Sequence, residues 1–190
     1  ELPKEALSVM DDGVALAPAE PSMRYARALI RSGLDDEDGA LADMQQVPAK
    51  QRSDGMRELV QRASVNQLID QATSTNAPPS ALTAQGLLQR AEALADNDDG
   101  LLYAVANAWF KRGQSSAGIA VFDRLEQRLG TLPAAVQLDY AALLHRAQDD
   151  DAVAQRLPEL LAQLQWTSAQ EAQLLALYGN HQERSIGRDR

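Results

Sequence analysis

The sequence predicts an all-α protein in which a pair of helices is repeated along the chain. The first observation is a pattern of a small residue, a large residue and a small or apolar residue that recurs 34 positions later. The matched sets are Ala6, Met10 and Gly13 with Ala40, Met44 and Val47; Ala84, Leu88 and Ala91 with Gly118, Phe122 and Leu125; and Gly113 with Ala147. A fixed period of this length is typical of helix pairs that bury their apolar faces against their neighbours.

Composition predicts the same fold class. Apolar residues make up 45% of the 190 residues, whereas aromatic residues make up only 4%. Such a core must be built from Ala and Leu at close contacts between helices, and Ala, Leu and Gln favour helix. No run rich in Val, Ile and Thr shows the alternation with period two that is typical of strands.

Ten helices are expected along the chain. Their ranges are 2–16, 23–31, 39–47, 55–72, 81–95, 101–112, 116–129, 134–146, 151–164 and 168–181. Pro18 ends the first helix and Pro48 the third, because proline cannot continue a helix. Gly33 is expected to end the second helix in the left-handed conformation. The acidic run 35–38 precedes the third helix, where carboxylates stabilise the positive end of the helix dipole.

Similar signals mark the later helices. Ser53 or Asp54 caps the fourth helix, and Ser80 caps the fifth. Gly113 separates the sixth helix from the seventh, and the turn 148–151 is expected to be one residue longer than its counterpart. Pro158 is expected to end, kink or begin the helix that contains it.

The last helix has a capping signal of its own. Thr167 or Ser168 caps it, and Gln170 and Glu171 stand three residues further on, at the spacing of a capping box. At the other end, the chain opens inside a helical pattern, so we expect it to be a segment of a longer protein.

We expect a single array over residues 1–190, with one interruption. The ranges are a first sub-array 1–72, a break or hinge 73–80, a second sub-array 81–184 and a frayed tail 185–190. The break is predicted from Pro78-Pro79 and from the step between Ala40 and Ala84, which is 44 residues rather than 34.

Charge and cysteine content exclude several classes of partner. The net charge of −9 argues against nucleic acid, because binding to phosphates requires clustered Lys and Arg. No run of about 18 apolar residues is present, so no membrane span is predicted. The absence of Cys excludes disulfides, Cys-ligated zinc and a thiol nucleophile, and it fits an oxidising compartment as well as a reducing one.

No motif for catalysis or for a metal is present. His145 and His181 are the only histidines, and they do not form an H-x3-H or H-E-x-x-H spacing. The acidic runs 35–38, 96–99 and 149–151 lack the order of ligands that an EF-hand requires, so helix capping is the preferred interpretation. We therefore predict no enzyme, no metal and no cofactor.

The helix pairs resemble tetratricopeptide repeats. That family places a large residue, a large–small pair, a large residue, Gly, a small residue, an aromatic residue and a small residue at fixed positions. The corresponding residues are Leu102, Val105-Ala106, Trp109, Gly113, Gly118, Phe122 and Leu125, then Tyr140-Ala141, Leu144, Ala147, Leu157 and Leu160, and earlier Tyr25-Ala26, Leu29, Gly33, Ala40 and Met44. The interruption at 73–80 and Leu125 at a usually small place depart from the pattern. The resemblance implies a right-handed superhelical solenoid whose first helices line a concave groove.

Two short segments are similar to the periplasmic repeat region of the bacterial cellulose synthase outer-membrane export subunit. The first is 47–56 followed by 59–62, and the second is 155–161 followed by a helix that opens at Trp166-Thr167. This resemblance implies a periplasmic scaffold, associated with the outer membrane, that helps to guide a β-1,4-glucan outward. It brings no catalytic residues.

Eight residues are the candidates for binding a partner in the groove. They are Arg27, Arg31, Tyr103, Asn107, Phe110, Lys111, His145 and Arg146. The basic residues stand near helix C-termini, where they either complement the helix dipole or line the groove. Tyr103, Asn107, Phe110 and Lys111 follow the spacing of one helical face, which could stack a sugar ring or hold a peptide.

The function expected from these observations is a non-enzymatic scaffold for protein–protein interaction in periplasmic assembly and export of cellulose or a related exopolysaccharide. The expected partners are other synthase and export subunits, with the β-glucan chain as a further candidate. The alternative is a generic peptide-binding adaptor, cytoplasmic or periplasmic, unrelated to polysaccharide export.

Overall fold

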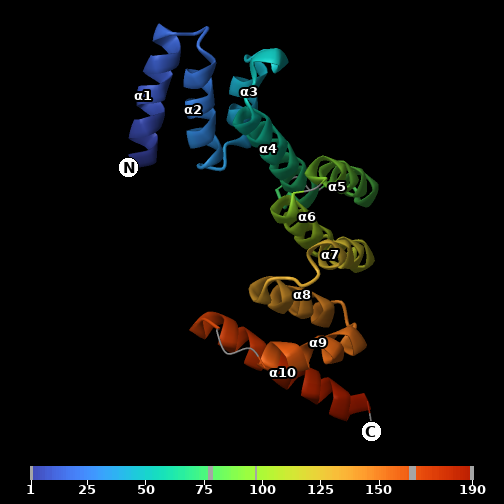
Figure 1. The fold of residues 1–190 in the computed structure, drawn as a ribbon. Helices are drawn as coiled ribbons and strands as arrows, with labels where there is room; N and C mark the ends of the chain where they lie inside the picture. Colours follow the sequence, from blue (N-terminus) through green and yellow to red (C-terminus); the bar gives the residue numbers. More distant parts are fainter. Residues whose placement is uncertain (1, 77–78, 97, 163–165, 189–190) are drawn as a thin grey trace. The chain divides into compact units, whose positions relative to one another are not determined.

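The computed structural model describes residues 2–76, 79–96, 98–162 and 166–188. Within these ranges the regular elements are α-helices and one short 3-10 turn, with no strand, which confirms the all-α prediction (Figure 1). The elements are α1 (Leu2–Leu16), α2 (Pro21–Ser32), α3 (Glu37–Gln45), η1 (Ala49–Gln51), α4 (Asp54–Thr73), α5 (Ala81–Ala95), α6 (Asp99–Lys111), α7 (Ser115–Leu129), α8 (Ala134–Arg146), α9 (Asp150–Ala162) and α10 (Ser168–Arg188).

The chain divides into two compact units, Glu1–Val105 and Ala106–Arg190, and the division falls within α6. The expected break at 73–80 includes residues 77 and 78, which lie outside the described residues, so that break stays a prediction. At the C-terminus, α10 extends to Arg188, beyond the end expected near His181. Residues 189 and 190 of the expected tail also lie outside the description.

In the first unit, consecutive helices pack against each other from α1 to α5. Figure 1 shows α1, α2 and α3 side by side. The Gln61 side-chain amide near the start of α4 donates to the carbonyl oxygen of Leu94 near the end of α5, at 2.8 Å. This contact requires α4 and α5 to run in opposite directions, as the predicted helix pairs do.

The core of the first unit contains the residues that the 34-residue pattern selected. Ala40, Met44 and Val47 are all at most 1% exposed and pack in one cluster with Ala28 of α2. Ala84, Leu88 and Ala91 of α5 are also fully buried. Alanine at these places lets helix backbones approach closely, and the larger residues fill the space beside each contact.

In the second unit, α8 packs on α7 and α9, and α10 packs on α8 and α9. Its core is centred on Phe122 and Tyr140, whose rings stack with centroids 4.3 Å apart. The Arg156 guanidinium lies 4.3 Å from the centroid of the Tyr140 ring and makes two hydrogen bonds with Glu126, at 3.1 and 2.8 Å. Trp109 is 2% exposed, which confirms its predicted place in the core.

Side-chain caps begin several helices at the predicted residues. Ser53 and Ser80 accept hydrogen bonds from the backbone N–H groups of Met56 and Thr83, respectively. Thr167 and Gln170 form the reciprocal pair of a capping box, because the Thr167 hydroxyl accepts from the Gln170 N–H while the Gln170 side chain accepts from the Thr167 N–H.

The acidic runs also act as caps. One carboxylate of each run accepts from a backbone N–H three residues ahead: Asp36 from Gly39, Asp98 from Leu101 and Asp149 from Ala152. This agrees with the capping interpretation of the runs. Asn97, in the second run, lies outside the described residues.

Two turns differ from the expectation. Gly33 has a φ of −70° and is right-handed, and the left-handed residue of that turn is Asp35, with a φ of 60°. The prediction for Gly33 was wrong because the turn is longer, so the chain reverses two residues later. Likewise Ala147 is right-handed and Gln148 has a φ of 64°, whereas Gly113 takes the positive φ (70°) in its own turn.

Pro158 lies inside α9, and the helix continues four residues beyond it, to Ala162. The helix therefore neither ends nor begins at the proline, although both outcomes were allowed by the sequence. Proline lacks the N–H that would bond to the carbonyl of residue 154, so this helix tolerates the loss of one internal hydrogen bond.

We expect Gly118→Ala to lower the free energy of unfolding of the unit 106–190 by about 1–2 kcal/mol. A Cβ at Gly118 would lie 2.6 Å from the Phe110 ring and 3.1 Å from the carbonyl oxygen of Ala106. The measurement is urea unfolding followed by tryptophan fluorescence. Gly179→Ala in α10 is the control: nothing lies within 4 Å of its Cβ position, so it should raise stability by about 0.5–1 kcal/mol. Equal effects of the two substitutions would contradict the proposed close contact.

Candidate functional site

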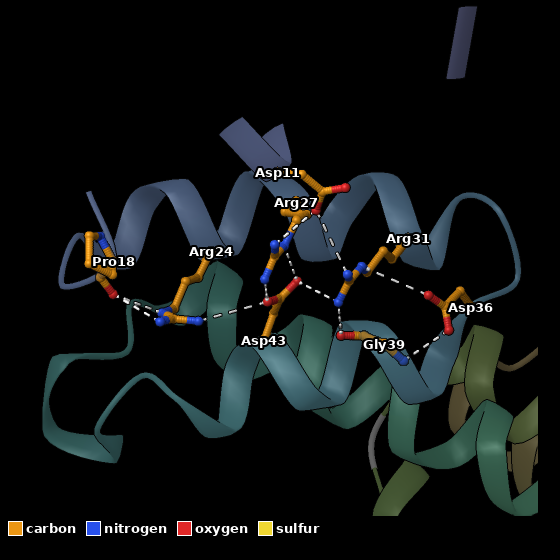
Figure 2. Close-up of polar contacts among 8 residues, drawn as sticks. All are labelled: Asp11, Pro18, Arg24, Arg27, Arg31, Asp36, Gly39 and Asp43. Atoms are coloured by element: carbon orange, nitrogen blue, oxygen red, sulfur yellow. Dashed lines mark hydrogen bonds and ion pairs between the residues drawn. The ribbon is translucent and has the colours of Figure 1, made fainter. Parts of the chain in front are cut away.

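Arg27 and Arg31, two of the predicted groove residues, lie in a network of charged side chains on α1, α2 and α3. Figure 2 shows the network, whose centre is the carboxylate of Asp43. The side chain of Asp43 is only 2% exposed, although it belongs to a helix that is otherwise open to solvent on one side. A buried carboxylate needs charged hydrogen-bond donors, because burial without them costs several kcal/mol.

Arginines of α2 supply these donors. Arg27 donates from Nε to one oxygen of Asp43 at 2.9 Å, and its Nη2 contacts the other oxygen, so the pair is bidentate. Arg31 donates from Nη1 to the same carboxylate at 3.1 Å, and Arg24 lies 4.0 Å from it. The three arginines follow the spacing i, i+3 and i+7, which puts them on one face of the helix.

A second shell of acceptors holds the arginines in place. Asp11 of α1 accepts from Arg27 Nη1 at 2.9 Å and lies 4.0 Å from Arg31. Arg24 donates to the carbonyl oxygen of Pro18 at 3.1 and 2.9 Å, and Arg31 donates to that of Gly39 at 3.1 Å. The network therefore joins α1, α2 and α3 through side chains and backbone together (Figure 2).

The network keeps Arg27 charged. Its hydrogen bond to Asp43 raises the pKa of the Arg27 guanidinium above its ordinary value, and burial opposes this shift only in part. Contact with Asp11 raises the same pKa further. Because Arg27 and Arg31 already have carboxylate partners, they hold the helices together, and the binding role predicted for them stays a prediction.

Asp43 is the residue that the sequence analysis missed. It directly precedes Met44, a core residue of the repeat pattern, so it was counted as part of a helix rather than as a partner for arginine. The available signal was the row of three arginines on one face of the preceding helix. Such a row requires a carboxylate opposite it whenever that face is covered by another helix.

The predicted residues of α6 lie at different depths. Tyr103, Asn107 and Phe110 are half-buried, and Lys111 is exposed. Phe110 packs against Gly118 and lies 6.2 Å from Phe122 between ring centroids, so its ring contributes to the core of the second unit.

His145 and Arg146 end α8 in the second unit. Arg146 is exposed, whereas His145 is half-buried near the carboxylate of Asp150, with 3.9 Å between Nδ1 and Oδ1. Arg184 of α10 donates to the carbonyl oxygen of His145 at 2.9 Å and to Asp150 at 3.3 Å. Burial lowers the pKa of His145, the positive charges of Arg184 and His181 lower it further, and Asp150 opposes them.

The arrangement of these side chains supports binding rather than catalysis. Among the described residues, no group of three or more His, Cys, Asp or Glu side chains is placed to hold a metal ion. Across the same part of the chain, the helices are too short or too polar to cross a membrane. What the described surface offers is charged and aromatic side chains along helices.

These features define an all-α protein of packed helix pairs that are joined by buried arginine–carboxylate contacts. Over 181 residues, the chain is 31% identical to "Cellulose synthase operon protein C" of Xanthomonas axonopodis pv. citri (strain 306). The alignment covers 93% of this chain, which in turn spans 12% of the length of that relative. The chain matches neither a family model nor a solved structure.

We expect Asp43→Asn to lower the free energy of unfolding of the first unit by about 3 kcal/mol, because the arginines lose the charge that compensates their burial. The measurement is hydrogen exchange at the amides of α2 and α3. Asp12→Asn is the matched control, since Asp12 is exposed on α1 and carries the same charge; it should change stability by less than about 0.5 kcal/mol. Similar effects of the two substitutions would show that the network does not stabilise the helices.

We expect the second unit to lose stability as the pH falls below the ordinary His pKa of 6.5. The pKa of His145 is lower in the folded chain, so in this window the unfolded chain binds the proton more readily, and the loss is complete below the folded pKa. The groups that face His145 are Asp150 of α9 and Arg184 and His181 of α10.

The measurement is urea unfolding followed by tryptophan fluorescence at about pH 7.5 and about pH 5.5, values on either side of the ordinary His pKa. His145→Gln should reduce the difference in stability between the two pH values. An unchanged difference would assign the pH dependence to other groups.

Proposed function

We propose that the chain is a non-enzymatic scaffold segment in the synthesis and export of cellulose or a related exopolysaccharide. The observation that carries this proposal is the 31% identity to "Cellulose synthase operon protein C", which extends over 93% of the chain. Because the chain spans 12% of that protein, the proposal concerns what one helical segment contributes to it. That contribution is to hold protein partners, namely other synthase and export subunits.

The fold supports a scaffold of stacked helix pairs. Contacts between residues 34 positions apart occur in both units: Gln61 with Ala95 in the first, and Asp139 with Gln173 and Asp150 with Arg184 in the second. This separation equals the sequence period, so a residue meets its counterpart in the next helix pair. It is the contact pattern expected of a tetratricopeptide-like solenoid, which is the architecture that we propose.

The proposed partner-binding surface consists of the predicted groove residues on α6 and α8. Lys111 and Arg146 are its exposed cations, and Tyr103 and Asn107 its half-buried polar side chains. Exposed cations at helix C-termini can meet acidic groups of a partner without losing an existing buried contact. The proposed compartment is the periplasm, where a chain without cysteine cannot form wrong disulfides.

The test is a segment exchange in Xanthomonas axonopodis pv. citri. Residues 1–190 replace the matching segment of operon protein C, and secreted cellulose is measured as acid-insoluble glucan. We expect the exchange to retain most of the cellulose that a deletion of the same segment abolishes, because the helical scaffold restores the partner contacts. Cellulose no higher than in the deletion strain, at equal protein level, would overturn the proposal.

The same strain tests the binding surface. Lys111→Glu with Arg146→Glu should reduce cellulose, whereas Lys50→Glu, an exposed cation outside the surface, should not. A titration of the purified chain with cello-oligosaccharides, followed by tryptophan and tyrosine emission, separates the two kinds of ligand. Saturable binding would indicate the glucan as the ligand of this surface, and its absence would leave the protein partners.

A further inference from the structure

The first unit has an acidic hollow of about 150 Å³ at its surface, between the start of α3 and the second half of α4. Its wall consists of the run Asp35–Asp38, together with Asp70 and the amides Gln67 and Gln71. No basic residue belongs to this wall. One of the carboxylates is already engaged, since Asp36 caps α3 through Gly39 and lies 3.8 Å from Arg31. The hollow nevertheless concentrates negative charge in a small space.

Glu37 gives this hollow a feature that capping does not explain. Its side chain belongs to the wall of the hollow, and the residue is only 8% exposed. Oε1 accepts a hydrogen bond from the Asn66 side-chain amide at 2.8 Å, but Oε2 is buried and has no hydrogen-bond donor. A buried carboxylate oxygen without a donor is unfavourable by about 1–3 kcal/mol or more, so the site lacks a positively charged donor.

The neighbouring side chains fix the acceptors in place. Asn66 holds Glu37, and the Gln67 side-chain amide contacts the carboxylate of Asp38. Both amides come from α4, and both carboxylates from the first turn of α3. The acceptors are therefore oriented before a ligand arrives, which lowers the entropy that binding costs.

The geometry favours an organic cation over a metal ion. Among the described residues, no acidic group is close enough to two others to form a metal site, and this includes the wall of the hollow. Acceptors that are spread over a wider space suit a planar group with several N–H donors, and the guanidinium of arginine has five such donors in a fixed plane. Lysine offers a compact charge that cannot reach separate acceptors at once.

We propose that the acidic hollow binds an arginine side chain of a protein partner, with Glu37 Oε2 as one of its acceptors. The inference rests on the proposed scaffold function, since it names the chemistry by which one partner is recognised. The net charge of the chain, −9, attracts a basic partner at long range, and the hollow then selects arginine at contact.

The test uses the whole 190-residue chain and three capped tripeptides, Gly-Arg-Gly, Gly-Lys-Gly and Gly-citrulline-Gly, at low ionic strength. The readout is the shift of backbone and side-chain amide signals in nitrogen-15 NMR spectra. We expect saturable shifts with the arginine peptide at residues 35–38 and 66–71, weaker shifts with lysine, and none with citrulline, which has the same shape without the charge. Equal shifts with arginine and citrulline, or none with arginine, would overturn the inference.

Glu37→Gln is the variant that tests the assigned acceptor, because it keeps the size and the bond to Asn66 while removing the charge. We expect it to weaken binding of the arginine peptide roughly tenfold. Asp12→Asn, with the same charge change on α1, should leave binding unchanged. Equal weakening by both variants would show attraction by net charge alone, and the NMR spectrum of each variant verifies that it folds.

A magnesium or calcium titration provides the third arm. Shifts at the same amides, stronger than those with the arginine peptide, would replace the proposal with a metal site. The result is separable from that of the segment exchange: cellulose export that persists with Glu37→Gln, in a chain that no longer binds the peptide, overturns only this inference. Loss of cellulose in the exchange with intact peptide binding overturns only the proposed function.

Discussion

Small residues at the contacts between helices are the constraint on which the rest of the structure depends. With 4% aromatic residues, the core cannot be filled by large rings, so the helix backbones must come close to one another. Ala28 and Ala40 in the first unit, and Gly118 in the second, occupy such contacts and are fully buried. At Gly118 the aromatic ring of Phe110 occupies the space that a side chain would take. Side chains such as Met44 and Phe122 then fill what remains.

Close helix packing brings a few charged groups under cover, and each unit handles them in the same way. Asp43 in the first unit and Asp150 in the second have side chains 2% and 6% exposed, and each meets arginine from a neighbouring helix. Such pairs add little stability compared with apolar residues of the same size. Their effect is selective, because a helix that slides by one turn leaves a buried carboxylate without its partner. The arginine network of α1, α2 and α3 thus favours one register among arrangements that small residues alone would allow.

The sequence was sufficient to predict the helices, most of their caps and the core positions of the repeat. Ala40 and Met44 could be placed in the core because burial follows from periodicity along a single helix. The left-handed residues of two turns could not be placed, since Asp35 and Gln148 take that conformation only because their turns are longer than the pattern at Gly113. The partner of Arg27 was equally inaccessible, because a contact between helices depends on their rotation about their axes, which periodicity does not specify.

The acidic run before α3 shows why local and long-range explanations have to be separated. A helix N-terminus needs one capping side chain, and Asp36 fulfils that need. Further carboxylates in the first turn gain a little from the helix dipole but repel one another, so their sum changes stability little when they are exposed. Glu37 is not exposed, and its second oxygen lacks a donor, so dipole effects do not account for its burial. By contrast, Asp150 is also buried after a capping aspartate, and Arg184 of its own unit meets it. The same sequence feature therefore has an internal cation in the second unit, and in the first it is arranged to receive one from a partner.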